Sequence, residues 1–389
     1  MSEQLAYALI TPYSLDKSRV GGMIARLIAR TGLNVVAARM FAPSREFAAE
    51  YAALLREPGH SDCEKTRGLL SDYVTRNFPP ANGLNKRIMV LLLQGEDAVQ
   101  KVRQAAGEPS PCCCPKGVSI AETFGDLIFD TQDTSKVVYF EPAIITANTP
   151  QGVTGALKIF LKYYQNGGIL RNTAQYPEGV RPQISLTMLK PDNFRFASAR
   201  PGHVLDFFSG TGLNIVGIKV QQMATAQAME FYGPVRDTLR TKLGGRVTEN
   251  IFPDIEKTLG CQFDEATKTQ VGEILCPTYG DSQFDNIVRF MSGRSESECP
   301  TAERQGPGTV TSWVIIFEGP DAISKIRQTL GPTNPAKATP GTIRREFGTD
   351  MMVNAAHASD SDESAAREIG ILVEKAPNLF KSICEKSIG

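Results

Sequence analysis

The chain has 389 residues, of which 41% are hydrophobic and 22% are charged, so it is long enough for two domains. Because 42 basic residues balance 42 acidic ones, the overall charge gives no reason to expect a nucleic acid or a membrane surface as partner, although a local basic pocket for phosphate would fit. No stretch approaches about 18 uninterrupted apolar residues, and the first residues do not read as a secretion signal, so we expect a cytoplasmic location.

The eight cysteines favour neither a metal site nor a disulfide framework. Cys112, Cys113 and Cys114 are adjacent and the other five are scattered, so the paired spacing typical of zinc ligands is missing. We therefore predict no metal ligands on the protein.

The first predicted strand lies in AYALITPYS, where an apolar run ends at Pro12. The segment RTGLNVVAARMFAPSREFAAEY (30–51) follows, and it indicates the end of a helix, a turn at glycine, a strand and a second helix. Further on, IMVLLLQGEDAVQKVRQAAG (88–107) combines an apolar strand, a turn with glycine and an amphipathic helix.

The same series returns in the second half of the chain. It consists of SLTMLKPDN, GTGLNIVGIKVQQMATAQAMEFY (210–232) and SWVIIFEGPDAISKIRQTLG (312–331), and its Thr-Gly-Leu-Asn lies 180 positions after the first one. The sequence therefore indicates a duplication in which each copy has the order βαββαβ. That order predicts an α+β fold with two ferredoxin-like domains, each an antiparallel sheet with helices packed mainly on one face.

We place the first domain at 1–165, a linker at 166–181 and the second domain at 182–389, because glycine and proline break both helix and strand in the polar linker. The second copy is longer than the first by about 45 residues between corresponding landmarks. Most of this excess falls in 233–283 and in the Gly/Ser/Pro-rich loop 292–311, which we interpret as insertions.

Three motifs of the second half resemble the nucleoside diphosphate kinase family. They are LKPD (189–192), GPTNPAKATPGTIRREFG (331–348) and NAAHASDSDESAAREI (354–369), and the family's last two motifs read approximately G-x-T-N-P-x(4)-P-G-T-I-R-x-x-F-G and N-x-x-H-G-S-D-S. The match is strong over about 312–370, fair over 184–232 and visible only in outline in the first half. The resemblance implies the same βαββαβ plan.

The resemblance also implies a reaction, the ping-pong transfer of the γ-phosphoryl group from a nucleoside triphosphate to a nucleoside diphosphate through phospho-His357. Imidazole suits this role because it is nucleophilic and partly neutral near pH 7. Its second ring nitrogen must be oriented, and the family places Glu368 there. Magnesium is the expected cofactor, carried mainly by the nucleotide phosphates.

The resemblance assigns roles to nine further residues. Lys190, Arg327 and Arg344 would contact ribose or phosphates, Thr333 would donate to phosphate, Tyr232 would lie beside the imidazole, Asn354 would bond the sugar hydroxyl, and Phe284 and Ile287 would flank the base opposite Met351. The cations Lys190, Arg327 and Arg344 would stabilise the transferred phosphoryl group, because that group carries dispersed negative charge.

The chain departs from the family at Ala358, where the family has glycine after the histidine. A glycine needed at positive φ would make this alanine costly, whereas at negative φ the methyl group would be tolerated. The following helix would begin at Ser359 or Asp360, and Asp360 and Glu363 have capping-box spacing.

The first half does not carry the motif residues. Thr134 falls at the histidine position, Thr11 at the lysine, Tyr13 at the aspartate and Ala121 at the arginine, whereas Arg103 and Tyr51 are kept. We interpret this half as a degenerate, structural copy. Since the family assembles as rings of identical subunits, we expect a homo-oligomer in which three tandem chains imitate six subunits.

Two rival interpretations remain. The segment VLDFFSGTG (204–212) is similar to the glycine-rich turn of S-adenosylmethionine-dependent methyltransferases, but it lies where the first half has MIARLIARTG (23–32), so we predict a helix that ends at glycine. The stronger rival is a catalytically weak or inactive nucleotide-binding protein on the kinase fold, with a regulatory or assembly role. His60 and His203 are interpreted as structural or solvated.

Overall fold

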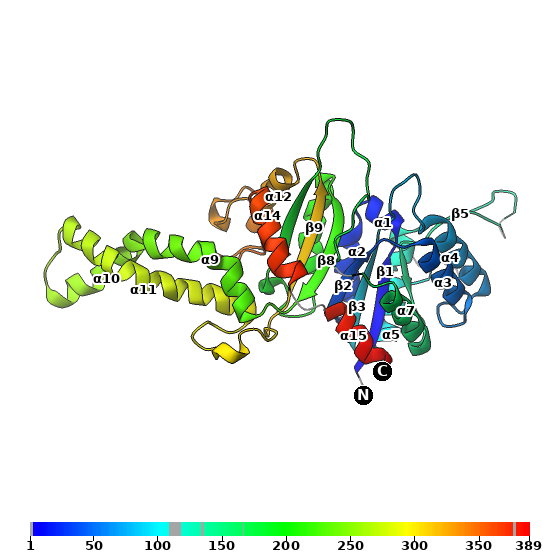
Figure 1. The fold of residues 1–389 in the computed structure, drawn as a ribbon, viewed down its shortest axis with the longest axis horizontal. Coiled ribbons are helices and arrows are strands. Elements are labelled where there is room, and N and C mark those ends of the chain that lie inside the picture. The colour runs from blue at the N-terminus through cyan, green and yellow to red at the C-terminus, as the bar shows by residue number, and fades with distance from the viewer. Residues whose placement is uncertain (1–2, 109–117, 134–135, 166, 376–378) are drawn as a thin grey trace. The chain divides into compact units, whose positions relative to one another are not determined.

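The computed structural model describes residues 3–108, 118–133, 136–165, 167–375 and 379–389 (Figure 1). The chain forms two compact units. The first unit comprises 1–221 together with 312–389, and the second comprises 222–311.

The first unit contains two four-stranded sheets, and the first of them is built by the N-terminal half. Its strands are β1 (Glu3–Ile10), β2 (Asn34–Phe41), β3 (Ile88–Glu96) and β6 (Ile144–Thr146), in the order β2-β3-β1-β6. All neighbouring strands are antiparallel. The helices of this half are α1 (Pro12–Asp16), α2 (Val20–Thr31), α3 (Arg45–Arg56), α4 (Glu64–Asn77), α5 (Ala98–Ala106), α6 (Ile120–Phe124) and α7 (Pro150–Lys162).

The second sheet repeats this order with later strands. Its strands are β7 (Gln183–Leu189), β8 (Asn214–Gln221), β9 (Ser312–Gly319) and β10 (Ala356–Ala358), in the order β10-β7-β9-β8, again antiparallel throughout. The helices of the C-terminal half within this unit are α8 (Arg200–Asp206), α12 (Ala322–Leu330), α13 (Ile343–Phe347), α14 (Asp362–Ile369) and α15 (Leu379–Ile388). The predicted α+β class with two antiparallel sheets is therefore confirmed.

Local details also recur 180 positions apart. Gly32 ends α2 at φ 63° and Gly212 ends the helical turn after α8 at φ 71°, a left-handed conformation that glycine adopts without strain. The hydroxyl of Thr31 accepts from the backbone N–H two residues later, as does the hydroxyl of Thr211. The ladder register shifts between Val35 and Ala37 in β2 and between Ile215 and Gly217 in β8. Both halves thus enter their second strand in the same way.

The segment 204–212 is helical. It comprises the end of α8 and a 3-10 turn (Phe207–Thr211), and strand β8 begins only after Gly212. The turn of the methyltransferases joins a strand to a following helix, which is the opposite order. The prediction of a helix that ends at glycine is confirmed, and the methyltransferase interpretation has no structural basis here.

The second unit consists of helices α9 (Thr225–Lys242), α10 (Gly244–Leu259) and α11 (Glu265–Ser292) with the segment that follows them (Figure 1). Helices α9 and α11 pack closely, because a Cβ atom at Gly280 would lie 2.6 Å from the backbone nitrogen of Arg240. Arg236 bonds Asp281 across the same contact (2.8 Å). The ranges 233–283 and 292–311, interpreted above as insertions, lie in this unit.

The end of the chain returns to the first sheet. The ring of Phe380 in α15 lies 5.7 Å from that of Phe41 in β2, at a steep angle, and both side chains are buried. Cys384 on the same helix is fully buried, and this burial raises the pKa of its thiol to about 12. The contact of α15 with β2 and α7 is visible in Figure 1.

The structure corrects one expectation about the cysteines, because Cys63 is disulfide-bonded. Cys112, Cys113 and Cys114 lie outside the described residues, as does Thr134. Within the described part of the chain, no helix is long and apolar enough to cross a membrane.

Candidate active site

The site is built around the edge strand β10, which places His357 opposite Met188 of β7. The side chain of His357 is 24% exposed, so a ligand can reach it. Ala355, just before the strand, has φ 69°, a conformation that alanine rarely adopts. Its carbonyl oxygen accepts from the backbone N–H of Lys190 (2.9 Å) and from Nδ2 of Asn193 (2.7 Å). The LKPDN segment therefore fixes the strained turn that leads into the histidine strand.

Ala358 closes β10 and pairs with Thr187 of β7. It is absent from the positive-φ residues of the described chain, so its backbone suits alanine. The sequence left open whether φ at this position is positive. The structure shows that it is not, so the methyl group of alanine is tolerated here.

Glu368 orients the imidazole. Its Oε1 lies 3.0 Å from Nε2 of His357, and its Oε2 accepts from the hydroxyl of Ser359 (2.7 Å). The Glu368 side chain is 4% exposed, so its carboxylate is shielded from water while the imidazole stays accessible. Arg367 also approaches Oε1, at 3.7 Å.

The helix that carries Glu368 begins later than the sequence indicated. Its N-cap is Ser361, whose side chain and that of Ser364 bond each other's backbone N–H groups. The expected pairing of Asp360 with Glu363 is wrong, because the serine hydroxyls take the capping positions. Ser359 is thereby left to bond Glu368 instead of capping the helix.

Lys190 lies at the end of β7 and is buried. Its Nζ donates to Oδ1 of Asn354 (2.8 Å) and to the carbonyl of Met352 (3.1 Å). Burial, with repulsion from Arg344, lowers the pKa of Lys190 to about 8. Asn354 donates in turn to the carbonyls of Thr333 and Met351 (2.9 Å each), so it joins Lys190 to the loops that carry these residues.

Arg200 braces the loop that follows Lys190. Its Nη2 donates to Asp192 (2.9 Å) and to the carbonyl of Phe347 (2.7 Å), and its Nε donates to Asn193 (3.0 Å). The brace therefore connects the Lys190 loop with α13, the helix that carries Arg344. Sequence reasoning missed Arg200; the one available signal was Asp192, a carboxylate beside a buried strand that needs a cationic partner.

Two arginines add positive charge near the imidazole. Arg344 donates to the carbonyls of Gly331 (2.9 Å) and Ala356 (3.2 Å), the latter next to His357 in the chain. Arg327 is exposed on α12, which contacts β10. Hydrogen bonding by Ser364 holds the pKa of Asp360 below its usual range, with smaller contributions from Arg327 and His357. These charges consequently share one neighbourhood.

Comparison with known proteins decides the family. The family model of nucleoside diphosphate kinase matches residues 237–377. The nucleoside diphosphate kinase of Bdellovibrio bacteriovorus is 47% identical over 174 residues, which cover 45% of this chain and 82% of that protein. The chain belongs to the nucleoside diphosphate kinase family.

Other members match over different lengths. The nucleoside diphosphate kinase of Symbiobacterium thermophilum is 50% identical over 70 residues, 18% of this chain and 47% of that protein, so the chain spans about half the length of this relative. The crystal structure of the Aquifex aeolicus nucleoside diphosphate kinase is 27% identical, covers 49% of this chain and 95% of that chain, and has a TM-score of 0.31.

Three residues assigned from the family resemblance belong to the second compact unit. Tyr232 is on α9 and is 8% exposed, and its ring packs on Phe231. Phe284 and Ile287 are on α11; Phe284 is 1% exposed, and the guanidinium of Arg236 lies 5.0 Å from its ring centre. Their contact with a nucleotide stays a prediction.

Proposed function

We propose that this member of the nucleoside diphosphate kinase family is an active kinase that transfers the γ-phosphoryl group between nucleotides through His357. The observation that carries the proposal is the bond of Glu368 to Nε2 of His357 (3.0 Å) in a partly open site. A carboxylate on one ring nitrogen fixes the tautomer and raises the nucleophilicity of the other.

In the proposed reaction, Nδ1 of His357 attacks the γ-phosphorus of a nucleoside triphosphate. The bond from this phosphorus to the bridging oxygen breaks, and the nucleoside diphosphate leaves with the electron pair. In the second half-reaction, a terminal phosphate oxygen of another diphosphate attacks the phosphohistidine and restores the imidazole. Glu368 stabilises the imidazolium character that develops in both steps.

The cations around His357 favour phosphoryl transfer over nucleotide binding without catalysis. Lys190, Arg327 and Arg344 would neutralise charge on the transferred group and on the leaving phosphate. Lys190 is held by Asn354, and its loop is braced by Arg200. Little reorganisation is therefore needed when the phosphates bind, which is the condition for efficient electrostatic catalysis.

Magnesium fits this site as an ion held mainly by the nucleotide. The described residues contain no group of three or more His, Cys, Asp or Glu side chains that could enclose a metal. Magnesium commonly uses one or two carboxylates with substrate phosphates, and Asp360, which is exposed near Arg327 and His357, is the carboxylate in reach. When bound, the ion would neutralise phosphate charge.

We propose further that residues 1–165 are a degenerate copy of the catalytic domain 182–389, joined by the linker 166–181. Support comes from the common strand order and from the details that recur 180 positions apart. Thr11, at the place of Lys190, is fully buried and donates to the carbonyl of Pro142 (2.7 Å). Arg103 is paired with Asp62. Thr11 therefore carries no charge, and the charge of Arg103 is balanced by a carboxylate.

The decisive experiment is transfer of the labelled γ-phosphate of ATP to the protein, followed by a chase with unlabelled GDP. The wild type should acquire an acid-labile label that moves to GDP, and His357→Ala should acquire none. His203→Ala, which changes an exposed histidine of the same unit, should behave as wild type. Binding of ATP without labelling of the wild type would overturn the kinase proposal in favour of a regulatory nucleotide-binding protein.

A further inference from the structure

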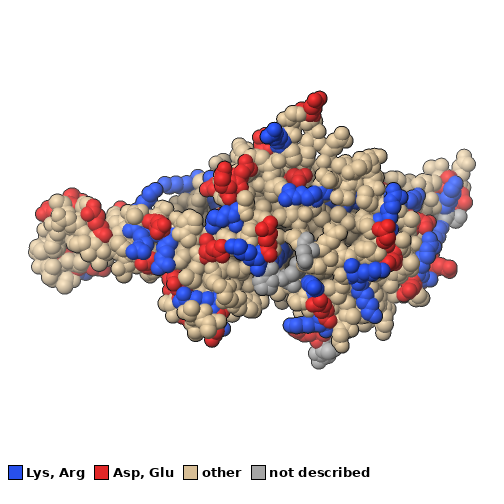
Figure 2. Space-filling view, viewed as in Figure 1, with Lys and Arg blue, Asp and Glu red and all other residues tan. Residues whose placement is uncertain are grey.

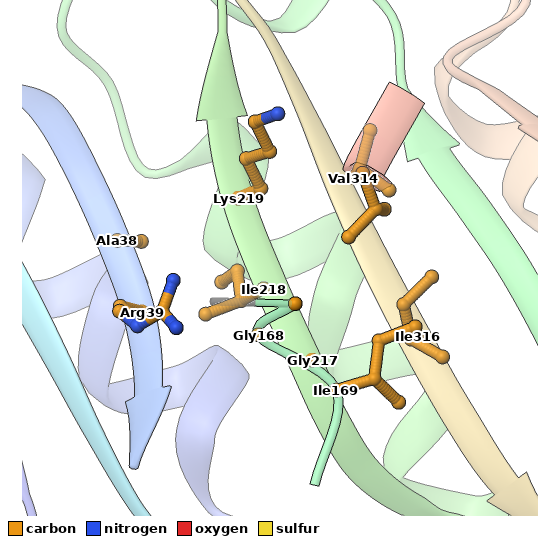
Figure 3. A pocket seen from close by; sticks show the side chains of 11 residues that line it. Ala38, Arg39, Gly168, Ile169, Gly217, Ile218, Lys219, Val314 and Ile316 are labelled. Atoms are coloured by element: carbon orange, nitrogen blue, oxygen red, sulfur yellow. The ribbon is translucent and has the colours of Figure 1, made fainter. Parts of the chain in front are cut away.

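A small cavity lies away from the kinase site, where β2 of the first sheet runs beside β8 of the second. It is lined by both strands, by the segment 167–169 that follows α7, and by two residues of β9 (Figure 3). The volume open to the centre of a water-sized sphere is about 20 Å³. Since one water needs about 10–15 Å³ by this measure, the cavity has room for one small species.

Arg39 is the charged group that dominates the cavity. It projects from β2 towards β8 and Gly168, as Figure 3 shows, and only 5% of the residue is exposed. Its Nη2 donates to the carbonyl of Gln165, and its guanidinium stacks on the ring of Tyr164 (3.9 Å). Its Nε is buried and has no hydrogen-bond partner. The guanidinium is thus held in place but incompletely satisfied.

Lys219 on β8 brings a second cation to the same cavity, and it is 8% exposed. Its Nζ donates to the carbonyl of Leu372 (2.9 Å). Repulsion from Arg39 adds to burial in lowering the pKa of Lys219 to about 8. Figure 3 shows this ammonium directed along β8, away from Arg39 and Gly168, so Arg39 is the cation that faces the space beside Gly168.

No carboxylate balances Arg39. Every Asp and Glu of the sequence falls within the described residues, and none of them forms an ion pair with Arg39 there. Arg87 gives the contrast, because it is equally buried at 5% but pairs with Asp16 (2.9 Å). A buried charge is costly without a counter-charge, so an anion from solution would stabilise Arg39 in this cavity.

Glycine makes the space for that anion. Gly168 has φ 77°, and a Cβ atom at this position would lie 3.2 Å from Nη1 of Arg39. Gly217 on β8 leaves the opposite wall without a side chain, and a Cβ atom there would lie 3.3 Å from the carbonyl oxygen of Gly168. A side chain at either position would narrow the cavity beside the guanidinium.

We infer that this cavity is a binding site for a single small monovalent anion, of the size of chloride, held by Arg39 between the two sheets, with Lys219 in the cavity wall. Its volume excludes a nucleotide. A bound anion would connect β2 and β8 electrostatically and so stabilise the association of the two sheets.

The test is thermal unfolding of the full chain in sodium chloride and in sodium gluconate at equal ionic strength, because gluconate is too large for the cavity. Chloride should raise the wild-type midpoint by about 2–4 °C over gluconate. Arg39→Met should lose this difference, and its midpoint in gluconate should equal or exceed that of the wild type, since an unbalanced buried charge is removed.

Arg87→Met is the matched control. It removes an equally buried arginine that has its own carboxylate, so its midpoint should fall in both salts while the chloride effect persists. Crystals soaked in bromide should show an anomalous peak beside Arg39 in the wild type and none in Arg39→Met. The inference is overturned if chloride has no effect on the wild type, if Arg39→Met keeps the full effect, or if bromide leaves the cavity empty.

Discussion

At the scale of single residues, the buried ammonium of Lys190 should make the proposed nucleotide binding depend on pH. Burial lowers its pKa from the usual 10.5 to about 8, so the charge is present below pH 8 and is lost as the pH rises through that value. A bound phosphate favours the charged form. The affinity for nucleotide should therefore fall on the alkaline side, whereas an unburied lysine would stay charged there.

We expect the KM for a nucleoside diphosphate to rise by about tenfold between pH 7 and pH 9.5, a loss comparable to one charge-assisted hydrogen bond. Steady-state kinetics over this range measure it. Lys190→Arg is the control, since guanidinium keeps its charge: its KM should be higher overall but nearly independent of pH. A wild-type KM that stays flat across the range would contradict the prediction.

Some residues of the site could be predicted from the sequence, and others could not. The pairing of His357 with Glu368 was expected from the family resemblance, which places a glutamate on the helix that follows the histidine, and the two side chains do meet. Ser359 and Arg200 could not be found this way, since their importance depends on which carboxylate or carbonyl approaches them in space. The conformation of Ala358 was open for the same reason, as φ is set by the pairing of β10 with β7.

At the scale of elements, α2 of the first half and α8 of the second cross at unusually short range. A Cβ atom at Gly202 would lie 2.2 Å from the backbone nitrogen of Ala25, and one at Gly21 would lie 2.4 Å from that of Asp206. Glycines on both helices thus permit backbone contact between elements more than a hundred residues apart in sequence.

Gly202→Ala should destabilise the protein by about 2 kcal/mol, because the helices must separate to admit the methyl group. Urea unfolding monitors this change. Gly210→Ala provides the control, since no atom lies within 4 Å of the added Cβ there and the free energy of unfolding should stay within about 0.5 kcal/mol of the wild type. Equal stability of the two variants would refute the close crossing.

Periodicity predicted the elements of both sheets but not this crossing. Strands β1 and β9 are continuous apolar runs, and α5 and α12 are amphipathic, so their identities are local properties of the sequence. The pairing of α2 with α8 and the return of α15 to the first sheet are contacts between distant segments. No local pattern encodes them, which is why the sequence left the association of the two halves undetermined.

At the scale of the whole molecule, an exposed hairpin of the first half is a candidate contact surface between chains. The hairpin of β4 (Asp126–Phe129) and β5 (Val137–Glu141) presents Ile128 and Tyr139 directly opposite each other, 53% and 43% exposed. Paired apolar side chains in water are unfavourable and commonly mark a contact surface. This hairpin belongs to the first half, for which we propose a structural role.

We expect three chains to form a closed ring in which the halves alternate, with this hairpin at the contact between chains. Light scattering should give three times the chain mass of 42.3 kDa. Ile128→Lys should lower the mass to that of one chain without changing phosphorylation of His357, because the residue lies outside the site. Ile274→Lys, which changes a residue that is 74% exposed on α11, should leave the mass unchanged. A wild type that scatters as a single chain would exclude the ring, and the first half would then act only within its own chain.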